Sequence, residues 1–144
     1  MIKNTSYNDK EIRQEINEHV GKPFGLMKRI TLRGNGSPRF RIVNASDQIS
    51  ALLAKNKNMI NYCNMELREG GIVVGFRSIL ETYSWSIPYY KLSIHSTGKR
   101  YTIYSGTEHI SIENDHRSDV NRLFMKKLRS LQSQYMDGSY IDYP

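Results

Sequence analysis

The sequence predicts an α+β domain, a bent antiparallel sheet or partial β-barrel of about seven strands closed by a C-terminal amphipathic helix. Residues 71–113 contain short segments with apolar side chains at alternate positions, as expected for a sheet with one buried face. Thr97-Gly98 and Gly106-Thr107 separate the last three segments and are short enough for hairpin turns. Residues 118–134 then repeat apolar side chains at helical spacing.

Length and composition indicate one domain without linkers or repeats. The 144 residues suffice for a single core, and 38% apolar with 24% charged residues is typical of soluble globular proteins. The expected organisation is an N-terminal helical extension over 1–23, a core over 24–134 and a loose tail over 135–144. No apolar run approaches the roughly 20 residues of a membrane span. Cys63 is the only cysteine, which excludes an internal disulfide and fits a reducing cytoplasm.

Residues 6–20 are expected to form a helix that lies on the outside of the domain. Asn8 and Glu11 have the polar-then-acidic spacing of a helix N-terminus. The narrow apolar stripe of this helix would consist of Ile12, Ile16 and Val20. Gly21-Lys22-Pro23 would end the helix.

Residues 26–33 and 39–43 are expected to pair as a hairpin across Gly34-Asn35-Gly36-Ser37, because an Asn-Gly pair tolerates the positive φ of a tight turn. One face of this hairpin would be apolar, with Lys28 as the exception. The other face would carry four arginines, which are Arg29, Arg33, Arg39 and Arg41. The segment 21–46 contains six basic residues and no acidic one, so it carries most of the net charge of +7.

A short inserted helix is expected over 46–57, with Ser46 as its N-cap. Its buried residues would be Ile49, Leu52 and Leu53. A strand over 59–68 follows, and its alternation places Cys63 on the buried face, where a thiol is inert packing.

The segment 77–89 is expected to be an irregular crossing or an edge strand, since Pro88 lacks an N–H donor. Trp85 is expected in the core. The remaining strands are expected at 71–77, 89–96, 99–105 and 108–113. The apolar face of the last helix would comprise Val120, Leu123, Phe124, Leu128 and Leu131.

No catalytic or metal-binding pattern is present. The four histidines have no metal-ligand spacing with each other or with Cys63, and no Gly-x-Ser-x-Gly sequence positions a nucleophile. No G-x-G-x-x-G sequence opens a helix. We therefore expect no enzyme, no metal and no cofactor.

The basic residues of the expected hairpin are the one feature that predicts a site. The planar fork of arginine forms two hydrogen bonds with a phosphate, so several arginines on one rigid surface can bind an anion. The candidate anion-binding residues are Lys28, Arg29, Arg33, Arg39 and Arg41. Suitable partners are an anionic lipid headgroup or a nucleic acid backbone. Nucleic acid is the less favoured partner, because few aromatic side chains interleave with the arginines. The alternative is a strand face that is simply solvated.

The order of elements resembles that of bacterial pleckstrin-homology-like (PH-like) domains over about residues 60–131. The resemblance is carried by Gly71-Ile-Val-Val-Gly-Phe, followed by Ser86-Ile-Pro-Tyr-Tyr-Lys-Leu-Ser-Ile. The family fold is a strongly bent antiparallel barrel closed by a C-terminal helix, and the helix expected over 46–57 is an insertion in that pattern. Lipid-binding members carry a Lys-x(n)-Arg-x-Arg pattern across their first hairpin, and Lys28, Arg39 and Arg41 stand in that arrangement.

The resemblance implies a non-enzymatic binding or scaffold module that engages a protein partner or an anionic surface through its basic hairpin. A nucleic-acid-binding protein that uses the same arginine face is the alternative. The expected location is the cytoplasm, with peripheral attachment to the membrane if the anionic surface is lipid.

Overall fold

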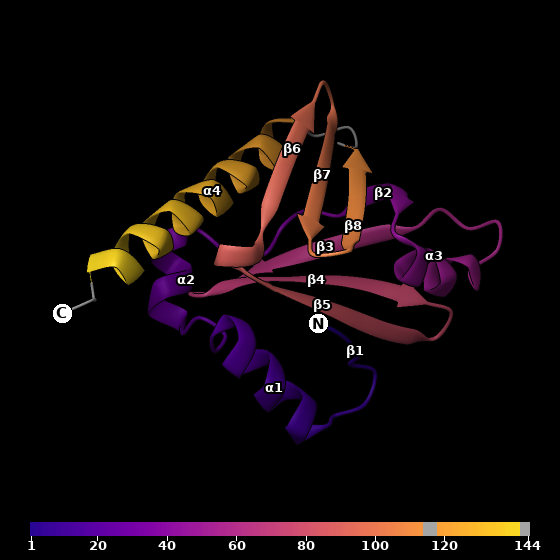
Figure 1. The fold of residues 1–144 in the computed structure, drawn as a ribbon, viewed down its shortest axis with the longest axis horizontal. Helices are drawn as coiled ribbons and strands as arrows, with labels where there is room; N and C mark the ends of the chain where they lie inside the picture. Colours follow the sequence, from indigo (N-terminus) through magenta and orange to yellow (C-terminus); the bar gives the residue numbers. More distant parts are fainter. Residues whose placement is uncertain (114–117, 142–144) are drawn as a thin grey trace.

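The computed structural model describes residues 1–113 and 118–141. Within these ranges the chain folds into one bent antiparallel sheet of eight strands that does not close into a barrel (Figure 1). The strands are β1 (Ile2–Asn4), β2 (Phe40–Ala45), β3 (Tyr62–Leu67), β4 (Gly71–Ser78), β5 (Glu81–Pro88), β6 (Ser93–Thr97), β7 (Arg100–Ser105) and β8 (Glu108–Glu113). The helices are α1 (Lys10–Val20), α2 (Leu26–Leu32), α3 (Asp47–Ala54), the 3₁₀ turn η1 (Tyr89–Lys91) and α4 (Ser118–Ile141). The expected α+β class and bent antiparallel sheet are confirmed.

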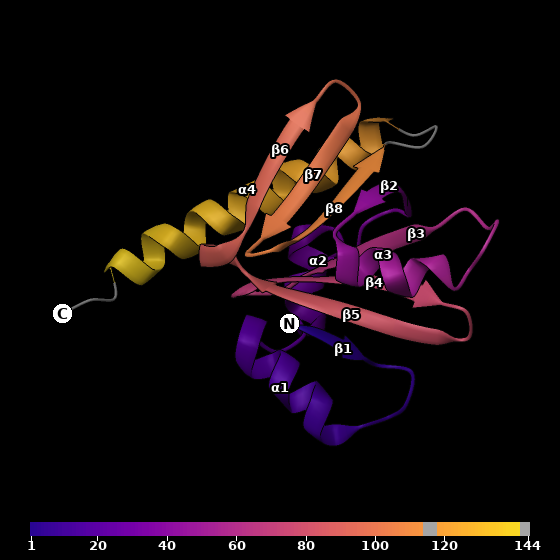
Figure 2. The same cartoon turned by 45° about the vertical axis from the view of Figure 1, so that its right-hand side comes forward.

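The bend of the sheet lies at β2, which joins two blocks of strands. The strand order is β1-β5-β4-β3-β2-β8-β7-β6, and β6 to β8 run across the direction of β3 to β5 (Figure 2). The pairing of β2 with β8 shifts in register between Ile42 and Asn44. Such a bulge bends a strand and increases its twist, which allows the sheet to turn at this point.

Helix α4 packs its apolar face into the concave side of the bent sheet. Phe124, Leu128 and Leu131 are buried, and the ring of Phe124 lies 6.3 Å from that of Phe40 on β2. Leu123, which was expected on the same face, is 61% exposed. The side chain of Val120 lies outside the described residues.

The predicted end of α4 at residue 134 is wrong, because the helix continues to Ile141. The side-chain amide of Gln132 donates hydrogen bonds to the carbonyl oxygens of Tyr89 (3.1 Å) and Leu92 (2.9 Å). These bonds hold α4 against η1. The segment expected as a loose tail is therefore helical over residues 135–141, and residues 142–144 lie outside the described ranges.

Helix α1 lies on the outer face of the sheet, as predicted. Ile16 and Val20 pack with Val73 of β4 in a small cluster separate from the main core. The N-cap is Asp9 rather than Asn8, and its carboxylate accepts a hydrogen bond from the backbone N–H of Glu11 (2.9 Å).

The predicted strand over 26–33 is wrong, because this segment forms helix α2. Arg33 adopts a left-handed conformation (φ 59°), and the N–H of Gly34 donates to the carbonyl of Arg29 over 2.8 Å. Together with the bond from Arg33 N to Ile30 O, this is the Schellman arrangement that ends helices. Gly34 therefore closes a helix instead of opening a hairpin turn.

The segment 77–89 also differs from expectation. It contains the regular strand β5, which pairs with β4 at eight positions and with β1 on its other side, so it is not an edge strand. Pro88 ends β5, where no further ladder hydrogen bond is needed. Trp85 is buried, as predicted. The strand expected over 89–96 begins only at Ser93, after η1.

The inserted helix is confirmed as α3, with Ile49 and Leu53 buried. Ser46 occupies the N-cap position, but its hydroxyl makes no capping bond. It donates to Glu108 Oε1 (3.1 Å) and accepts from the backbone N–H of His109 (3.1 Å), which ties the start of α3 to β8.

Candidate functional site

The structure divides the five predicted anion-binding residues into two groups. Lys28, Arg29 and Arg33 belong to α2 and its C-cap, whereas Arg39 and Arg41 lie at the start of β2. The predicted face of four arginines on one hairpin is therefore wrong, because it required residues 26–33 to be extended.

The chain path along β3 separates the two groups. Asn35, next to the end of α2, accepts a hydrogen bond from the N–H of Leu67, and Arg41 pairs with Tyr62. Leu67 and Tyr62 are opposite ends of β3, and five residues of extended chain span about 17 Å. The two groups are thus distinct sites.

Both arginines of β2 already have partners within the protein. The guanidinium of Arg39 lies 3.9 Å from the centre of the Tyr62 ring. Arg41 Nη2 contacts Glu113 Oε2 at 2.7 Å, and Arg100 Nη2 contacts Glu113 Oε1 at 3.1 Å. Hydrogen bonds from these two arginines lower the pKa of the Glu113 carboxyl group.

The other group surrounds an apolar surface that the sequence did not predict. Leu26, Met27 and Ile30 of α2 are 65%, 78% and 63% exposed. At about 100° per residue these three side chains form one stripe along the helix. We call Leu26, Met27 and Ile30, with Lys28, Arg29 and Arg33, the α2 surface.

Helix α2 is fixed to the protein on the side opposite this stripe. Leu32 and the preceding Phe24 pack against the main core. The ammonium of Lys127 on α4 donates to the carbonyl of Arg33 (3.2 Å) and also reaches that of Gly34 (3.5 Å). The apolar stripe therefore points away from the protein.

Basic side chains lie along one edge of the stripe. The helical angle places Arg29 along the edge next to Leu26, and Arg33 follows on that side at the C-cap. Lys28 lies instead towards the anchored side near Leu32, and its ammonium is 5.9 Å from the centre of the Phe24 ring. All three are exposed, and none of them forms an ion pair within the described residues. An exposed apolar stripe bordered by basic side chains is typical of helices that lie at an anionic lipid interface.

The positions of Met27 and Lys28 in the sequence favour a helix over residues 26–33, which the sequence-based prediction of a strand overlooked. In a strand, Lys28 interrupts the apolar face and Met27 has no role. In a helix, Leu26, Met27 and Ile30 share one side without interruption. A test of both periods over residues 26–33 would have favoured the helix.

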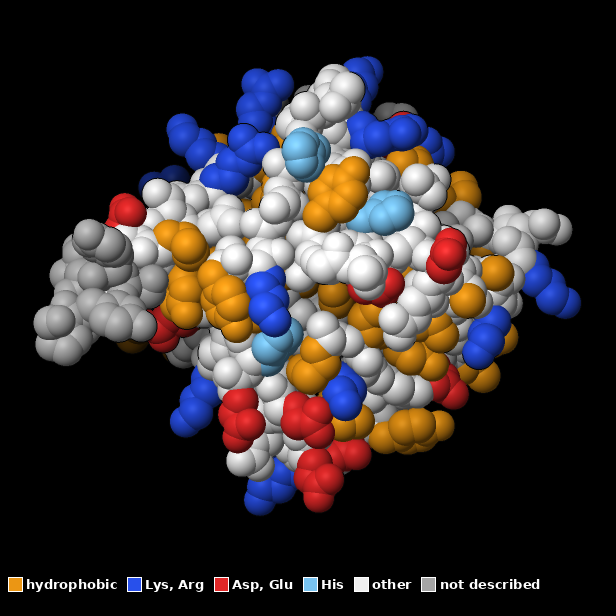
Figure 3. Space-filling model, viewed as in Figure 1, with side chains coloured by type: hydrophobic (Ala, Val, Ile, Leu, Met, Phe, Trp, Pro, Cys, Tyr) orange, Lys and Arg blue, Asp and Glu red, His pale blue; other side chains and the backbone are white. Residues whose placement is uncertain are grey.

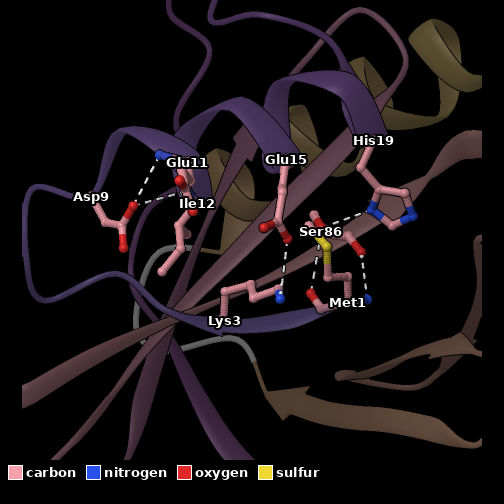
Figure 4. Close-up of polar contacts among 8 residues, drawn as sticks. All are labelled: Met1, Lys3, Asp9, Glu11, Ile12, Glu15, His19 and Ser86. Atoms are coloured by element: carbon pink, nitrogen blue, oxygen red, sulfur yellow. Dashed lines mark hydrogen bonds and ion pairs between the residues drawn. The ribbon is translucent and has the colours of Figure 1, made fainter.

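The structure also brings a histidine to a serine, although not in a form that can attack a substrate. His19 Nδ1 lies 2.8 Å from Ser86 Oγ, as Figure 4 shows. Ser86 is only 1% exposed, and its hydroxyl also lies 3.4 Å from the carbonyl oxygen of Met1. The pair fastens α1 and β1 to β5. Burial lowers the pKa of His19, and the ammonium groups of Met1 and Lys91 act in the same direction.

Cys63 is buried on the inner face of β3, as predicted. Burial raises the pKa of its thiol to about 12, so the reactive thiolate is not formed at neutral pH.

No family model matches this chain, and no curated protein matches it. In the ranges 1–113 and 118–141, no helix combines the length and apolar character needed to cross a membrane. In the same ranges, no three side chains of His, Cys, Asp or Glu gather in a way that could hold a metal ion. The geometry of the α2 surface is therefore the observation on which a function can be argued.

Proposed function

We propose that this protein is a non-enzymatic binding module of PH-like type that attaches reversibly to an anionic membrane surface through α2. The observation that carries this proposal is the exposed apolar stripe of Leu26, Met27 and Ile30 with Arg29 and Arg33 along one edge. The basic hairpin of the sequence-based hypothesis is replaced by a basic helix, but the segment 21–46 still has no acidic residue.

The PH-like type is supported by the order of elements after residue 39. Seven antiparallel strands, β2 to β8, are followed by α4, which packs against the concave side of the bent sheet. In this proposal β1, α1 and α2 are additions before the domain, and α3 is an insertion between its first two strands.

The energies of the α2 surface suit weak, reversible attachment. Complete burial of a Leu, Ile or Met side chain stabilises by about 1.5–3 kcal/mol. Each basic residue near an anionic leaflet adds roughly 1 kcal/mol. Helix α2 is only seven residues long, so it could lie in the interface but not cross it.

Vesicle sedimentation tests the electrostatic half of the proposal. Wild-type protein should sediment with phosphatidylserine–phosphatidylcholine vesicles at low salt, less at high salt, and hardly at all with pure phosphatidylcholine. Lys28→Glu with Arg29→Glu should remove most of the binding. Lys55→Glu with Lys57→Glu makes the same change of charge near α3 and should leave most of it.

Three results would contradict the proposal. These are equal binding to charged and neutral vesicles, equal loss in both pairs of variants, and absence of vesicle binding at low salt. If the protein instead shifts single-stranded RNA in a gel, and Lys28→Glu with Arg29→Glu abolishes that shift without any vesicle binding, the nucleic-acid alternative replaces it.

A further inference from the structure

A cleft lined by cationic side chains lies beside α1, where the chain leaves this helix towards α2. Its volume is about 630 Å³, within the usual range of small-ligand sites. The cations on its wall are Lys10, Arg13, Lys22 and Arg68, and the one carboxylate there is Glu18. Ile16 and Pro23 add an apolar part to the lining.

Arg68 is the fixed part of this cleft. Only 8% of the residue is exposed, and its guanidinium is held from three directions. Nε donates to Glu66 Oε1 (2.7 Å), and Nη1 donates to Asn17 Oδ1 (3.1 Å) and to the carbonyl of Gly21 (2.7 Å). The carbonyl of Arg68 in turn accepts a hydrogen bond from the buried hydroxyl of Tyr89. The guanidinium is thus oriented before any ligand arrives.

The third nitrogen of the Arg68 guanidinium is available to a ligand. Nη2 has no hydrogen-bond partner among the described residues, and it is not fully enclosed by the protein. A largely buried arginine with an unused donor at the wall of a cleft can bind an oxyanion without first losing a bond to the protein.

The remaining charges of the cleft are cationic in excess. Glu66 already offsets Arg68 through their ion pair. The three other cations, which are Lys10, Arg13 and Lys22, outnumber the single carboxylate of Glu18. Lys10 and Arg13 belong to α1, whereas Lys22 lies in the segment that follows it. Acidic side chains gather on the face of α1 that Figure 3 shows, at the lower edge of the view. At 100° per residue Lys10 and Arg13 lie on a different side of α1 from Glu11 and Glu15, and the cleft borders the side of Lys10 and Arg13.

We infer that this cleft is a binding site for a small phosphate monoester. Nη2 of Arg68 would donate to one phosphate oxygen, and Arg13 and Lys22 would approach the others from the two walls. A phosphate monoester matches the excess positive charge, and a short carbon skeleton would contact Ile16 and Pro23. The volume leaves room for such a skeleton beside the phosphate.

The ligand could be free or belong to a lipid. Only three residues separate Lys22 from Leu26, the first residue of the α2 surface. A lipid source rests on the proposed function, because the headgroup would then enter the cleft while the stripe of α2 lies in the membrane. A free phosphate monoester requires no membrane.

Titration of the full chain, followed by NMR of its backbone amides, tests the site. Inorganic phosphate and glycerol 3-phosphate should shift the amides around Asn17, Lys22 and Arg68, and glycerol 3-phosphate should bind more tightly. Arg68→Gln would also release α1 from β3, so the informative variant is Arg13→Gln with Lys22→Gln, at two exposed positions. Its affinity for glycerol 3-phosphate should fall at least about tenfold.

Lys55→Gln with Lys99→Gln removes the same charge at positions that do not line the cleft and should leave the affinity within about twofold. Equal weakening in the two variants, or shifts outside the cleft, would overturn the inference. So would the absence of shifts at millimolar glycerol 3-phosphate.

Vesicles separate the two sources of phosphate. Phosphatidic acid carries a phosphate monoester, whereas phosphatidylserine does not. A lipid source predicts that Arg13→Gln with Lys22→Gln weakens binding to phosphatidic acid vesicles more than to phosphatidylserine vesicles of the same charge density. If glycerol 3-phosphate binds but neither vesicle does, the cleft stands and the membrane proposal fails. If vesicles bind while glycerol 3-phosphate causes no shifts, the membrane proposal stands and the cleft fails.

Discussion

Two groups of neighbouring exposed apolar side chains in the described part of the chain differ in backbone and in charge. The first is the α2 surface. The second, which we call the hairpin tip, comprises Met59, Ile60, Ile79 and Leu80, whose exposures lie between 57% and 84%. It combines the loop after α3 with the turn between β4 and β5, on the far side of the molecule from α2 (Figure 1).

The hairpin tip is held in shape by polar contacts. The side chain of Asn56 donates to the carbonyl of Arg77 and accepts from the N–H of Ile79, and Ser78 Oγ donates to the carbonyl of Leu52. Ile79 adopts a left-handed conformation (φ 56°), which is costly for a β-branched residue. The tip is thus a rigid turn with local strain.

The α2 surface is a regular helix that is anchored on one side only. Arg29 and Arg33 lie along one of its edges, and no acidic residue lies within the segment 21–46. The tip also has Lys57 and Arg77 nearby, but Glu81 follows Leu80 directly. Exposed apolar side chains alone therefore do not identify a membrane contact. The charges around them favour the α2 surface, rather than the hairpin tip, as that contact.

The largest expected effect separates the two regions directly. Met27→Glu with Ile30→Glu should weaken partition into phosphatidylserine vesicles at least about a hundredfold, because it removes two apolar contacts and adds two repelled charges. Met59→Glu with Leu80→Glu is the matched change at the hairpin tip and should cost much less. Sedimentation at several lipid concentrations measures both, and the reverse order would assign the membrane contact to the tip.

A second, smaller effect concerns the support of the tip. Asn56→Ala removes the side-chain bonds to Asn61, Arg77 and Ile79 and should lower the free energy of unfolding by about 1–3 kcal/mol. Asn58→Ala, at an exposed position in the same loop, should change it by less than about 0.5 kcal/mol. Urea denaturation gives both values. Equal stability of the two variants would show that the tip does not depend on Asn56.

The strain at Ile79 predicts a gain in stability. Ile79→Asn should raise the free energy of unfolding by about 1 kcal/mol, since asparagine tolerates positive φ better than a β-branched residue. Leu80→Asn, next to it, lies at a position without positive φ and should be nearly neutral. Thermal denaturation of the two variants measures this difference in stability. A loss of stability in Ile79→Asn would contradict a strained turn.

The smallest effect concerns the C-terminal end of α2. Lys127→Gln removes the hydrogen bonds to the carbonyls of Arg33 and Gly34 and should cost about 0.5–1 kcal/mol. Hydrogen exchange of the Arg33 and Gly34 amides should become faster, whereas Lys126→Gln at the neighbouring exposed position should leave it unchanged. Equal exchange in both variants would show that Lys127 does not hold α2.

Local periodicity was sufficient to predict several strands and the last helix, even where both faces of a strand are buried, as in β4. Alternation predicted β4, β7 and β8, and the spacing of Phe124, Leu128 and Leu131 predicted the buried face of α4. Leu26 and Ile30 fit both a strand and a helix, so the choice depended on Met27, Lys28 and the use of Gly34. Gly34 suits a hairpin turn as well as the residue after a helix C-cap, and only the surrounding fold selects between them.

The sequence predicted which basic residues form the candidate site, but it did not predict which of them lie together in the structure. The basic residues of the segment 21–46 were identified, yet their grouping depended on the conformation of residues 26–33. The cleft at Arg68 was not accessible to sequence reasoning, because it joins α1 to the end of β3 across 51 residues of chain. Strand β1 likewise has only three residues, and its pairing with β5 depends on tertiary contacts.

The position of β2 has a consequence for the order in which the domain folds. Strands β3 to β5 are joined by short turns, as are β6 to β8, so each block can form from contacts that are local in sequence. Arg41 of β2, in contrast, meets Glu113 across 72 residues, and closing so long a loop is slow. We expect folding to be limited by the capture of β2, so Phe40→Ala should slow refolding, whereas Trp85→Phe should chiefly speed unfolding. The six residues of β2 would thereby govern how fast the whole domain assembles.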